Sequence, residues 1–155
     1  MPMFSSLAEE VREGLVTLPY YGVFDWLESE VRPNGVVILK GQVVTAAMKS
    51  DAEVRSRRIR GVDKVINNVE VLPVSSKDEQ LRLAVHLAIY KWTSPLFRYA
   101  TRAMPPIHII VKNGQVTLKG SVATDADKES AVWLASSVPS VTGVIDELKL
   151  EPPVD

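Results

Sequence analysis

The stretch GQVTLKGSV, residues 114–122, predicts the fold of this chain. It is entered through the pair Asn113-Gly114, which is typical of a tight β-hairpin turn because both central residues of a type I′ turn need a positive φ. Val116 and Leu118 alternate with polar residues, as a half-buried strand requires. Residues 114–122 are therefore expected to form the second strand of a hairpin.

The same pattern occurs earlier in the chain. Asn34-Gly35 opens the stretch GVVILKGQV, and Gly41 follows its turn at the same distance as Gly120 follows the later one. A constant offset of 79 residues aligns further identical residues without a gap, namely Val37/Val116, Leu39/Leu118, Lys40/Lys119, Ala52/Ala131, Val62/Val141, Val65/Val144 and Ile66/Ile145. Two copies of one structural unit therefore organise the chain.

The length of 155 residues and the repeat together predict two small domains. The expected division is residues 1–73, a linker at 74–77, residues 78–151, and a disordered tail at 152–155. Domains of this size bury only about 60–65% of their extended-chain surface. We therefore expect the two copies to pack on each other.

Composition excludes several classes of protein. Apolar residues make up 46% of the chain and charged residues 24%, which rules out wholesale disorder, and a net charge of −1 argues against nucleic-acid binding. The absence of cysteine excludes disulfides and thiolate metal sites. No apolar run is long enough to span a membrane, and the N-terminal residues lack the pattern of a signal peptide.

Each copy is expected to run helix, strand, strand, helix, strand. Capping boxes at 6–9 and 76–79 predict where the first helix of each copy starts. Leu81, Ala84, Val85, Ala88 and Trp92 mark the helix of the second copy. The expected elements of copy one are a helix at 7–18, strands at 27–32 and 36–43, a helix at 45–60 and a strand at 62–72. In copy two they are an inserted helical turn from Pro95, strands at 106–112 and 114–122, a helix at 125–138 and a strand at 141–150.

These motifs resemble the BON domain (bacterial OsmY and nodulation), in two copies. Copy one matches at Asn34, Gly35, Leu39, Gly41, Gly61, Val62, Val65, Asn67, Asn68 and Val71. Copy two matches at Gly114, Val116, Leu118, Gly120, Val141, Val144 and Leu150. The second copy departs where Ser140 replaces the helix-ending glycine and Asp146-Glu147 replace the Asn-Asn pair. The positions expected to shape turns are Asn34, Gly35, Gly41, Gly61, Asn113, Gly114 and Gly120.

The resemblance implies an α+β fold of two tandem αββαβ sandwiches, each with two helices packed on a three-stranded mixed sheet. It also implies a periplasmic or cell-envelope location and a role in binding anionic phospholipid or envelope proteins, in envelope maintenance or osmotic stress. The family signature consists of structural glycines and core aliphatic residues. It therefore assigns no catalytic residue, and the expected protein is not an enzyme.

The residues themselves show no pattern for catalysis or metal binding. His86 and His108 are the two histidines, and no carboxylate lies close in sequence to either. Nucleophile, phosphate-loop and dinucleotide motifs are absent. We therefore expect no catalytic residue, no metal ligand and no cofactor.

One segment is unusual in its charge. Between Gln80 and Thr124 there is no acidic residue, whereas six basic residues and both histidines fall inside. Aromatic and basic side chains alternate there, as in membrane-interface anchors. The candidate residues for contact with lipid or a partner are Lys91, Trp92, Leu96, Phe97, Arg98, Tyr99 and Arg102.

Two interpretations of this acid-free window stay open. In the first, its basic groups bind an anionic membrane surface, with about 1 kcal/mol from each engaged group. In the second, Trp92, Phe97 and Tyr99 fill the interface between the copies, together with the aromatic connector at residues 20–26. A protein-protein assembly module that uses the sheet edges, with weak homo-oligomerisation, is the alternative function.

Overall fold

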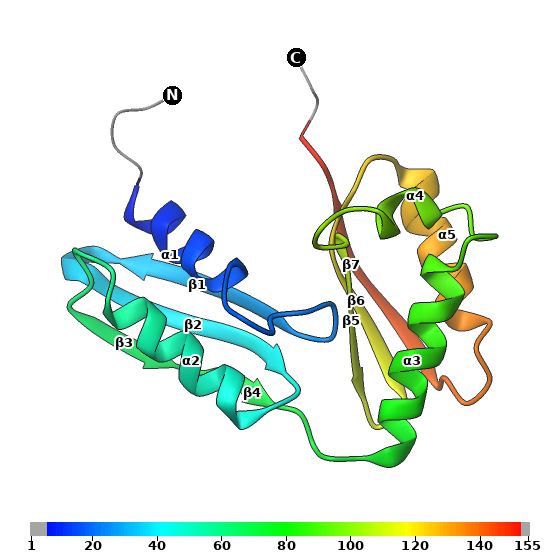
Figure 1. The fold of residues 1–155 in the computed structure, drawn as a ribbon, viewed down its shortest axis with the longest axis horizontal. Helices are drawn as coiled ribbons and strands as arrows, with labels where there is room; N and C mark the ends of the chain where they lie inside the picture. The colour runs from blue at the N-terminus through cyan, green and yellow to red at the C-terminus, as the bar shows by residue number, and fades with distance from the viewer. Residues whose placement is uncertain (1–5, 153–155) are drawn as a thin grey trace. The chain divides into compact units, whose positions relative to one another are not determined.

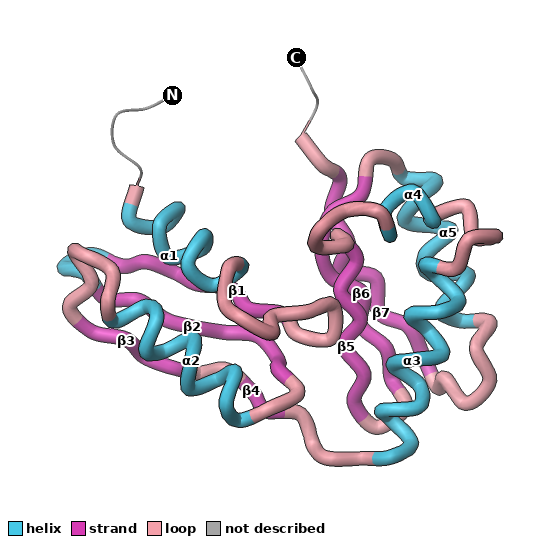
Figure 2. The backbone as a smooth tube through the Cα atoms, in the orientation of Figure 1, coloured by secondary structure: helices cyan, strands magenta, loops and turns pink. Residues whose placement is uncertain are grey.

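The computed structural model describes residues 6–152, and the predicted tail at 152–155 lies outside this range except for Pro152. The chain forms two compact units. Unit 1 consists of the described residues up to Tyr21 together with Asp25–Leu72. Unit 2 consists of Gly22–Phe24 together with the described residues from Pro73 onward. The predicted α+β class is confirmed, because each unit has the order αββαβ around a mixed sheet (Figures 1 and 2).

Unit 1 is a sheet in which β2 is central, antiparallel to β1 and parallel to β3 and β4. Helices α1 and α2 pack on this sheet and on each other (Figure 1). Its elements are α1 (Leu7–Val16), β1 (Trp26–Arg32), the 3-10 turn η1 (Pro33–Gly35), β2 (Val36–Val43), α2 (Ala46–Arg57), β3 (Lys64–Asn67) and β4 (Glu70–Val71).

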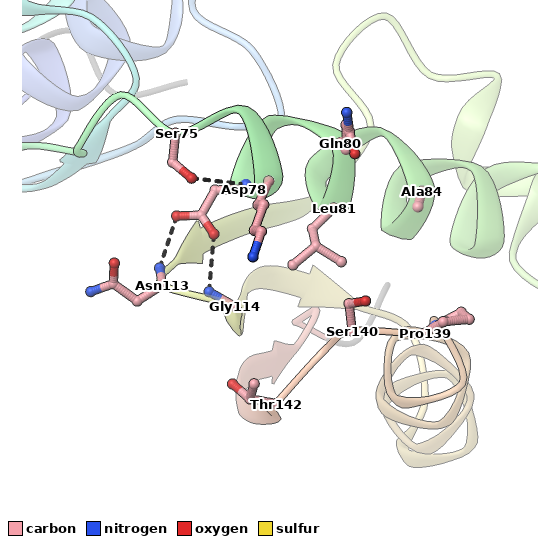
Figure 3. A pocket seen from close by; sticks show the side chains of 11 residues that line it. Ser75, Asp78, Gln80, Leu81, Ala84, Asn113, Gly114, Pro139, Ser140 and Thr142 are labelled. Carbon is pink, nitrogen blue, oxygen red and sulfur yellow. Dashed lines mark hydrogen bonds between the residues drawn. The ribbon is translucent and has the colours of Figure 1, made fainter.

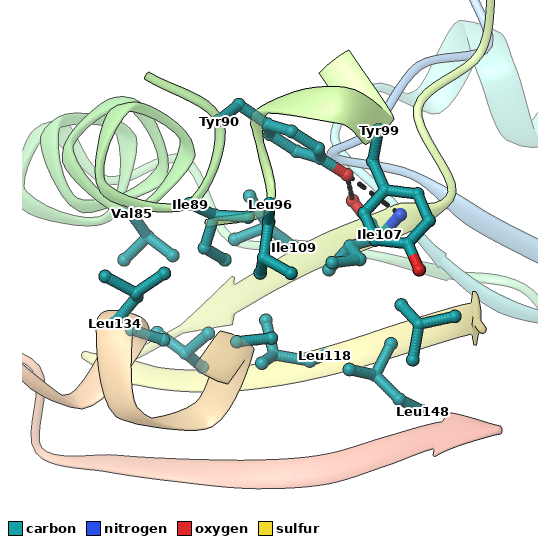
Figure 4. Close-up of a cluster of buried hydrophobic side chains, with 14 of the residues drawn as sticks. Val85, Ile89, Tyr90, Leu96, Tyr99, Ile107, Ile109, Leu118, Leu134 and Leu148 are labelled. Atoms are coloured by element: carbon teal, nitrogen blue, oxygen red, sulfur yellow. Dashed lines mark hydrogen bonds between the residues drawn. The ribbon is translucent and has the colours of Figure 1, made fainter. Parts of the chain in front are cut away.

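Unit 2 repeats this arrangement with strand order β5-β6-β7 and one additional short helix, α4. Its core is formed by Val85 and Ile89 of α3, Ile107 and Ile109 of β5, and Leu118 of β6 (Figure 4). Its elements are α3 (Ser76–Tyr90), α4 (Phe97–Ala100), β5 (Ile107–Lys112), β6 (Gln115–Val122), α5 (Asp125–Ser136) and β7 (Gly143–Leu150).

The glycines Gly41 and Gly120 hold equivalent places in the two sheets. Both have φ of +121°, and each lies opposite the first strand of its hairpin, at Leu27 and Ile107 respectively. A Cβ at either glycine would overlap the backbone carbonyl oxygen of the preceding residue of that strand. The prediction that these positions need glycine therefore has a steric reason as well as a conformational one.

The two hairpin turns differ by one residue. Asn113 and Gly114 have φ of 51° and 82° in a two-residue turn between Lys112 and Gln115, as predicted. In unit 1 the loop also contains Pro33, since Arg32 pairs with Val36. Asn34 and Gly35 still have positive φ, 68° and 74°. The Asn-Gly pair thus turns the chain in both units, although the first loop is a three-residue one.

The third strand of unit 1 corrects one sequence prediction. The strand expected at 62–72 is observed as two shorter strands, β3 and β4, which keep one register on β2. Between them the Asn68 N–H donates to Leu39 O (2.9 Å) and the Val69 N–H donates to Asn67 Oδ1 (3.2 Å). In β7 the Leu148 N–H likewise donates to Asp146 Oδ1 (2.9 Å). Both third strands therefore satisfy one backbone N–H with a side chain two residues earlier.

Helix boundaries differ from the predictions by a few residues. Ser6 caps α1 by accepting from the Glu9 N–H, as predicted, but Ser75 rather than Ser76 caps α3. The helices α1, α2 and α5 end two or three residues earlier than expected. The residues of α3 that enter the core are Leu81, Val85 and Ile89. Trp92 lies beyond the helix end, because Lys91 is already extended, with ψ of 156°.

Candidate binding surface

The segment that follows α3 is held in unit 2 by two buried side chains, Leu96 and Tyr99. Both are at most 1% exposed and belong to the core cluster. Ser94 turns the chain into this position, since its hydroxyl donates to Ile89 O and accepts from the Leu96 N–H (3.0 Å). The structure therefore places Leu96 and Tyr99 in the core, where their side chains anchor α4 rather than lie at the surface.

Tyr99 also anchors α4 to α5 through a polar network. Its hydroxyl accepts from the Ala123 N–H (2.9 Å) and donates to Asp127 Oδ2 (2.6 Å), and Arg98 donates to the same oxygen. Burial alone would raise the pKa of Asp127, but the hydrogen bonds from Arg98 and Tyr99 outweigh it and hold that pKa below its ordinary value. Burial and the bond to Asp127 raise the pKa of Tyr99. The network is thus fully paired at neutral pH.

The acid-free window is not acid-free in space. Arg98 pairs with Asp127, and Arg102 pairs with Glu151 at 3.3 Å. Both guanidinium groups lie over the Tyr99 ring, 4.5 and 4.9 Å from its centroid. Because α5 and the end of β7 supply these carboxylates, the two arginines are used within unit 2. Their predicted role as free basic groups for lipid is not what the geometry favours.

The other basic residues of the window are also mostly engaged. Arg82 is buried and donates to Val111 O (3.0 Å), and Lys119 pairs with Glu147 (3.2 Å). Lys91 differs, since within residues 6–152 it forms no ion pair. It lies at the C-terminal end of α3, and its ammonium group is available to solvent.

Large apolar side chains project from the outer face of α3. Leu83 and Leu87 are 59% and 63% exposed. They lie one helical turn apart, on the face opposite the buried residues of the helix. Trp92 lies just beyond the C-terminal end of the helix and is 78% exposed. We call Leu83, Leu87, Lys91 and Trp92 the α3 stripe. Leu83 and Leu87 were not predicted as site residues, although their spacing of four on a helix with an assigned core face was a usable signal.

Phe97 is the other exposed aromatic residue among the predicted contacts. It begins α4 and is 41% exposed. Its neighbours Leu96 and Arg98 point respectively into the core and to Asp127. Of the seven predicted contact residues, the structure thus leaves Lys91, Trp92 and Phe97 exposed outside any described ion pair, whereas the exposed Arg98 and Arg102 side chains are ion-paired.

Unit 2 also has a groove of about 690 Å³ (Figure 3). It lies between the first turns of α3, the Asn113-Gly114 turn and the loop at 139–142. The Asp78 carboxylate fixes two of these walls by accepting from the N–H groups of Asn113 (2.8 Å) and Gly114 (3.0 Å). Because Asp78 is used in this way, it positions the turn rather than offering a free charge to a ligand.

The two histidines have different surroundings in unit 2. His86 packs between the rings of Phe24 and Tyr90, with centroid distances of 5.9 and 5.1 Å, and burial lowers its pKa. His108 is buried in β5. Within residues 6–152, no three His, Asp or Glu side chains are arranged to hold a metal ion.

The two αββαβ units define a protein built from two small domains of one type. The exposed side chains of the α3 stripe lie on the second domain. The family model for the BON domain matches residues 25–73 and 100–152. The chain therefore belongs to the BON-domain family, as the sequence motifs predicted.

Relatives and solved structures give the following similarities. The chain is 31% identical over 121 residues to the outer membrane lipoprotein DolP of Haemophilus influenzae, covering 75% of this chain and 58% of that protein. It thus spans less than two thirds of that relative. The C-terminal domain of CdsD, a structural protein of the type III secretion system of Chlamydia trachomatis, gives a TM-score of 0.36 at 14% identity, covering 97% of this chain and 100% of that one. That score supports no inference.

The helices of the described chain are too short or too polar to be membrane spans. In the part of the chain from residue 6 to residue 152, none is both long enough and apolar enough to cross a bilayer.

Proposed function

We propose that this protein is a non-catalytic module of the cell envelope that contacts phospholipid surfaces through the α3 stripe of unit 2. Membership of the BON-domain family and similarity to an outer membrane lipoprotein support the envelope location and a role in envelope maintenance. The observation that carries the proposal is the exposure of Leu83, Leu87 and Trp92 on and beside the outer face of α3.

The mechanism is apolar insertion with a small electrostatic contribution. The leucine side chains on the outer face of α3 and the tryptophan beyond its end enter the boundary between headgroups and acyl chains, where tryptophan is favoured. Lys91 at the end of the stripe adds about 1 kcal/mol next to an anionic leaflet. Since Arg98 and Arg102 are paired with Asp127 and Glu151, they add little. Binding is therefore expected to be only weakly sensitive to salt.

Co-sedimentation with vesicles containing phosphatidylglycerol tests this proposal. The double variant Leu83→Gln, Leu87→Gln should bind about tenfold more weakly, because two half-exposed leucines lose roughly 1.5 kcal/mol of burial. The matched control is Val54→Gln, which changes an exposed apolar residue of α2 in unit 1. Equal binding by the double variant and the control would contradict the proposal.

Assembly through a sheet edge is the second candidate function. Strand β7 pairs with β6 on one side, and no described strand pairs with its other side. Light scattering with and without anionic vesicles separates the two functions. A discrete oligomer that ignores vesicles favours assembly, whereas a monomer that binds them favours the lipid surface.

A further inference from the structure

The two Asn-Gly hairpin turns differ in what holds their backbone. In unit 2 the Asp78 carboxylate accepts from the N–H groups of Asn113 (2.8 Å) and Gly114 (3.0 Å), one with each oxygen (Figure 3). Asp78 itself is only 3% exposed. This turn therefore cannot open without breaking two hydrogen bonds to a buried charged group.

The turn of unit 1 has no such partner. Glu9 stands at the position equivalent to Asp78, because each donates its N–H to the N-cap serine of the first helix of its unit. Glu9 is exposed, however. Among residues 6–152, no side chain accepts from the N–H of Asn34 or Gly35. The carboxylate clamp is therefore specific to the turn of unit 2.

Both turns also bind the loop that precedes the third strand of their sheet. The Asp63 N–H donates to Gly35 O (2.8 Å), and the Thr142 N–H donates to Gly114 O (3.0 Å). Since this bond occurs in both units, it does not distinguish the two turns. A difference in the reactivity of the two pairs would therefore be due to Asp78.

An Asn-Gly pair can react with itself, because glycine has no Cβ to shield its nitrogen and asparagine is a thermolabile residue. The glycine nitrogen loses its proton to hydroxide and attacks the asparagine Cγ. A C–N bond forms and closes an imide ring, while the Cγ–Nδ2 bond breaks and ammonia leaves with a proton from water. Water then opens the ring at either carbonyl, giving aspartate or isoaspartate. The whole reaction consumes one water and releases one ammonia.

We propose that Asn34 is a site of spontaneous deamidation and isomerisation, and that Asp78 protects Asn113 from the same reaction. The turn must open for the glycine nitrogen to reach Cγ, and the two bonds to Asp78 oppose this opening. The carboxylate also disfavours the negative charge that the nitrogen acquires. No carboxylate restrains the Asn34 turn in this way.

Modification at Asn34 would alter a closely packed turn. A Cβ at Gly35 would overlap Gly61 O. Isoaspartate adds one atom to the backbone at the residue before this glycine, so it should disturb the contact between the turn and the loop at 61–63. The reaction would thus change unit 1 and leave unit 2 intact.

Peptide mass spectrometry of the full chain, incubated in mildly alkaline buffer, tests the proposal. Electron-transfer fragmentation separates the aspartate and isoaspartate products at each position. Asn34 should convert about tenfold or more faster than Asn113, the factor expected for hydrogen bonds to a charged group. Both rates should rise with pH, because hydroxide removes the proton.

The variant Asp78→Ala should raise the rate at Asn113 about tenfold or more and leave the rate at Asn34 unchanged. The matched control is Asp127→Ala, since Asp127 has the same place after the N-cap of α5 and is 8% exposed, but binds Tyr99 and Arg98 instead of the turn.

If Asp78→Ala does not fold, Asp78→Asn offers one carbonyl oxygen to the two N–H groups and should give a smaller increase in the same direction. Equal rates at Asn34 and Asn113 in the unchanged chain would overturn the proposal. So would a rate at Asn113 that does not respond to the Asp78 variants. Equal acceleration by Asp127→Ala would also overturn it, since general loosening of unit 2 would then be the cause.

Discussion

Unit 1 and unit 2 meet the same backbone requirement with different side chains. The N–H that follows β2 in unit 1 belongs to Val44 and donates to Asp25 Oδ1 (2.9 Å). The equivalent N–H in unit 2 belongs to Ala123 and donates to the Tyr99 hydroxyl (2.9 Å). A carboxylate just before β1 is thus replaced by a phenol from α4. The comparison teaches that the fold fixes which backbone group needs a partner, and leaves open which element supplies it.

The third strands show the same relation. Asn67 accepts from Val69 and donates from Nδ2 to Lys49 O (2.9 Å). The Asp146 carboxylate accepts from the Leu148 N–H but has no N–H to donate. Its second oxygen instead faces Lys128 Nζ at 4.0 Å. The departure from the family pair at 146–147 therefore exchanges an amide-to-carbonyl bond for an ammonium-carboxylate contact, and the bond from the N–H two residues later is kept.

The largest expected effect comes from the features that the units share most closely. Gly41→Ala and Gly120→Ala should each destabilise their unit by on the order of 4 kcal/mol or more, because the new Cβ overlaps a backbone carbonyl and φ is positive. Thermal unfolding followed by circular dichroism measures this. Gly143→Ala is the control, since its Cβ would meet only Gln115 Nε2 at 3.9 Å. A tolerated alanine at either position would break the equivalence of the two sheets.

The Tyr99 network should contribute the next largest effect. Tyr99→Phe removes one hydroxyl and leaves the Ala123 N–H and the Asp127 carboxylate short of a partner, which costs about 2 kcal/mol. Chemical denaturation measures the change in the free energy of unfolding. Tyr20→Phe removes an exposed hydroxyl and should have no effect. Equal stability of the two variants would mean that α4 does not replace Asp25 in the way described above.

Exchanging the loop residues before the third strands sharpens the comparison further. Ser140 has φ of 77°, and Gly61 stands at the equivalent position with φ of 101°. Ser140→Gly should stabilise unit 2 by roughly 0.5–1 kcal/mol, because a side chain at positive φ is strained. Gly61→Ser should destabilise unit 1 by a similar amount, as measured by denaturant midpoints. Destabilisation by Ser140→Gly would show instead that the hydroxyl at the groove rim makes a favourable contact.

The smallest expected effect is a pH dependence confined to unit 2, which holds both histidines. Burial lowers the pKa of His86 in the folded state, so the folded protein binds fewer protons there than the unfolded chain. Stability from this group is present above the ordinary pKa of histidine and is lost as the pH falls below it. Unfolding midpoints measured between pH 7.5 and 5 should fall less steeply for His86→Gln. Parallel pH profiles would remove this role of His86.

Short-range sequence rules predicted much of the local geometry. The repeat, both Asn-Gly turns and the need for glycine at 41 and 120 follow from short-range rules on φ and strand alternation. The partners of the charged residues could not be predicted in this way. Arg98 and Asp127 are brought together only by the packing of α4 on α5, so a segment without acids in sequence acquires carboxylates in space.

Burial on α3 could be predicted only in part. The helical period identified Leu81 and Val85 as core residues, but it also included Trp92 in that stripe. The period fails there because Lys91 leaves the helix, and helix ends are set by caps and tertiary contacts that a periodic pattern does not contain. The groove beside Asp78 depends on three distant segments and had no sequence signal beyond Ser140.

The place of Gly22–Phe24 in unit 2 has a consequence for how the gene can be divided. The sequence repeat and the compact unit do not coincide, because unit 2 includes three residues that precede most of unit 1 in the chain. A fragment that starts at the linker would therefore lack Gly22–Phe24, which belong to the second unit. A faithful minimal fragment would have to graft that tripeptide back, for example by circular permutation.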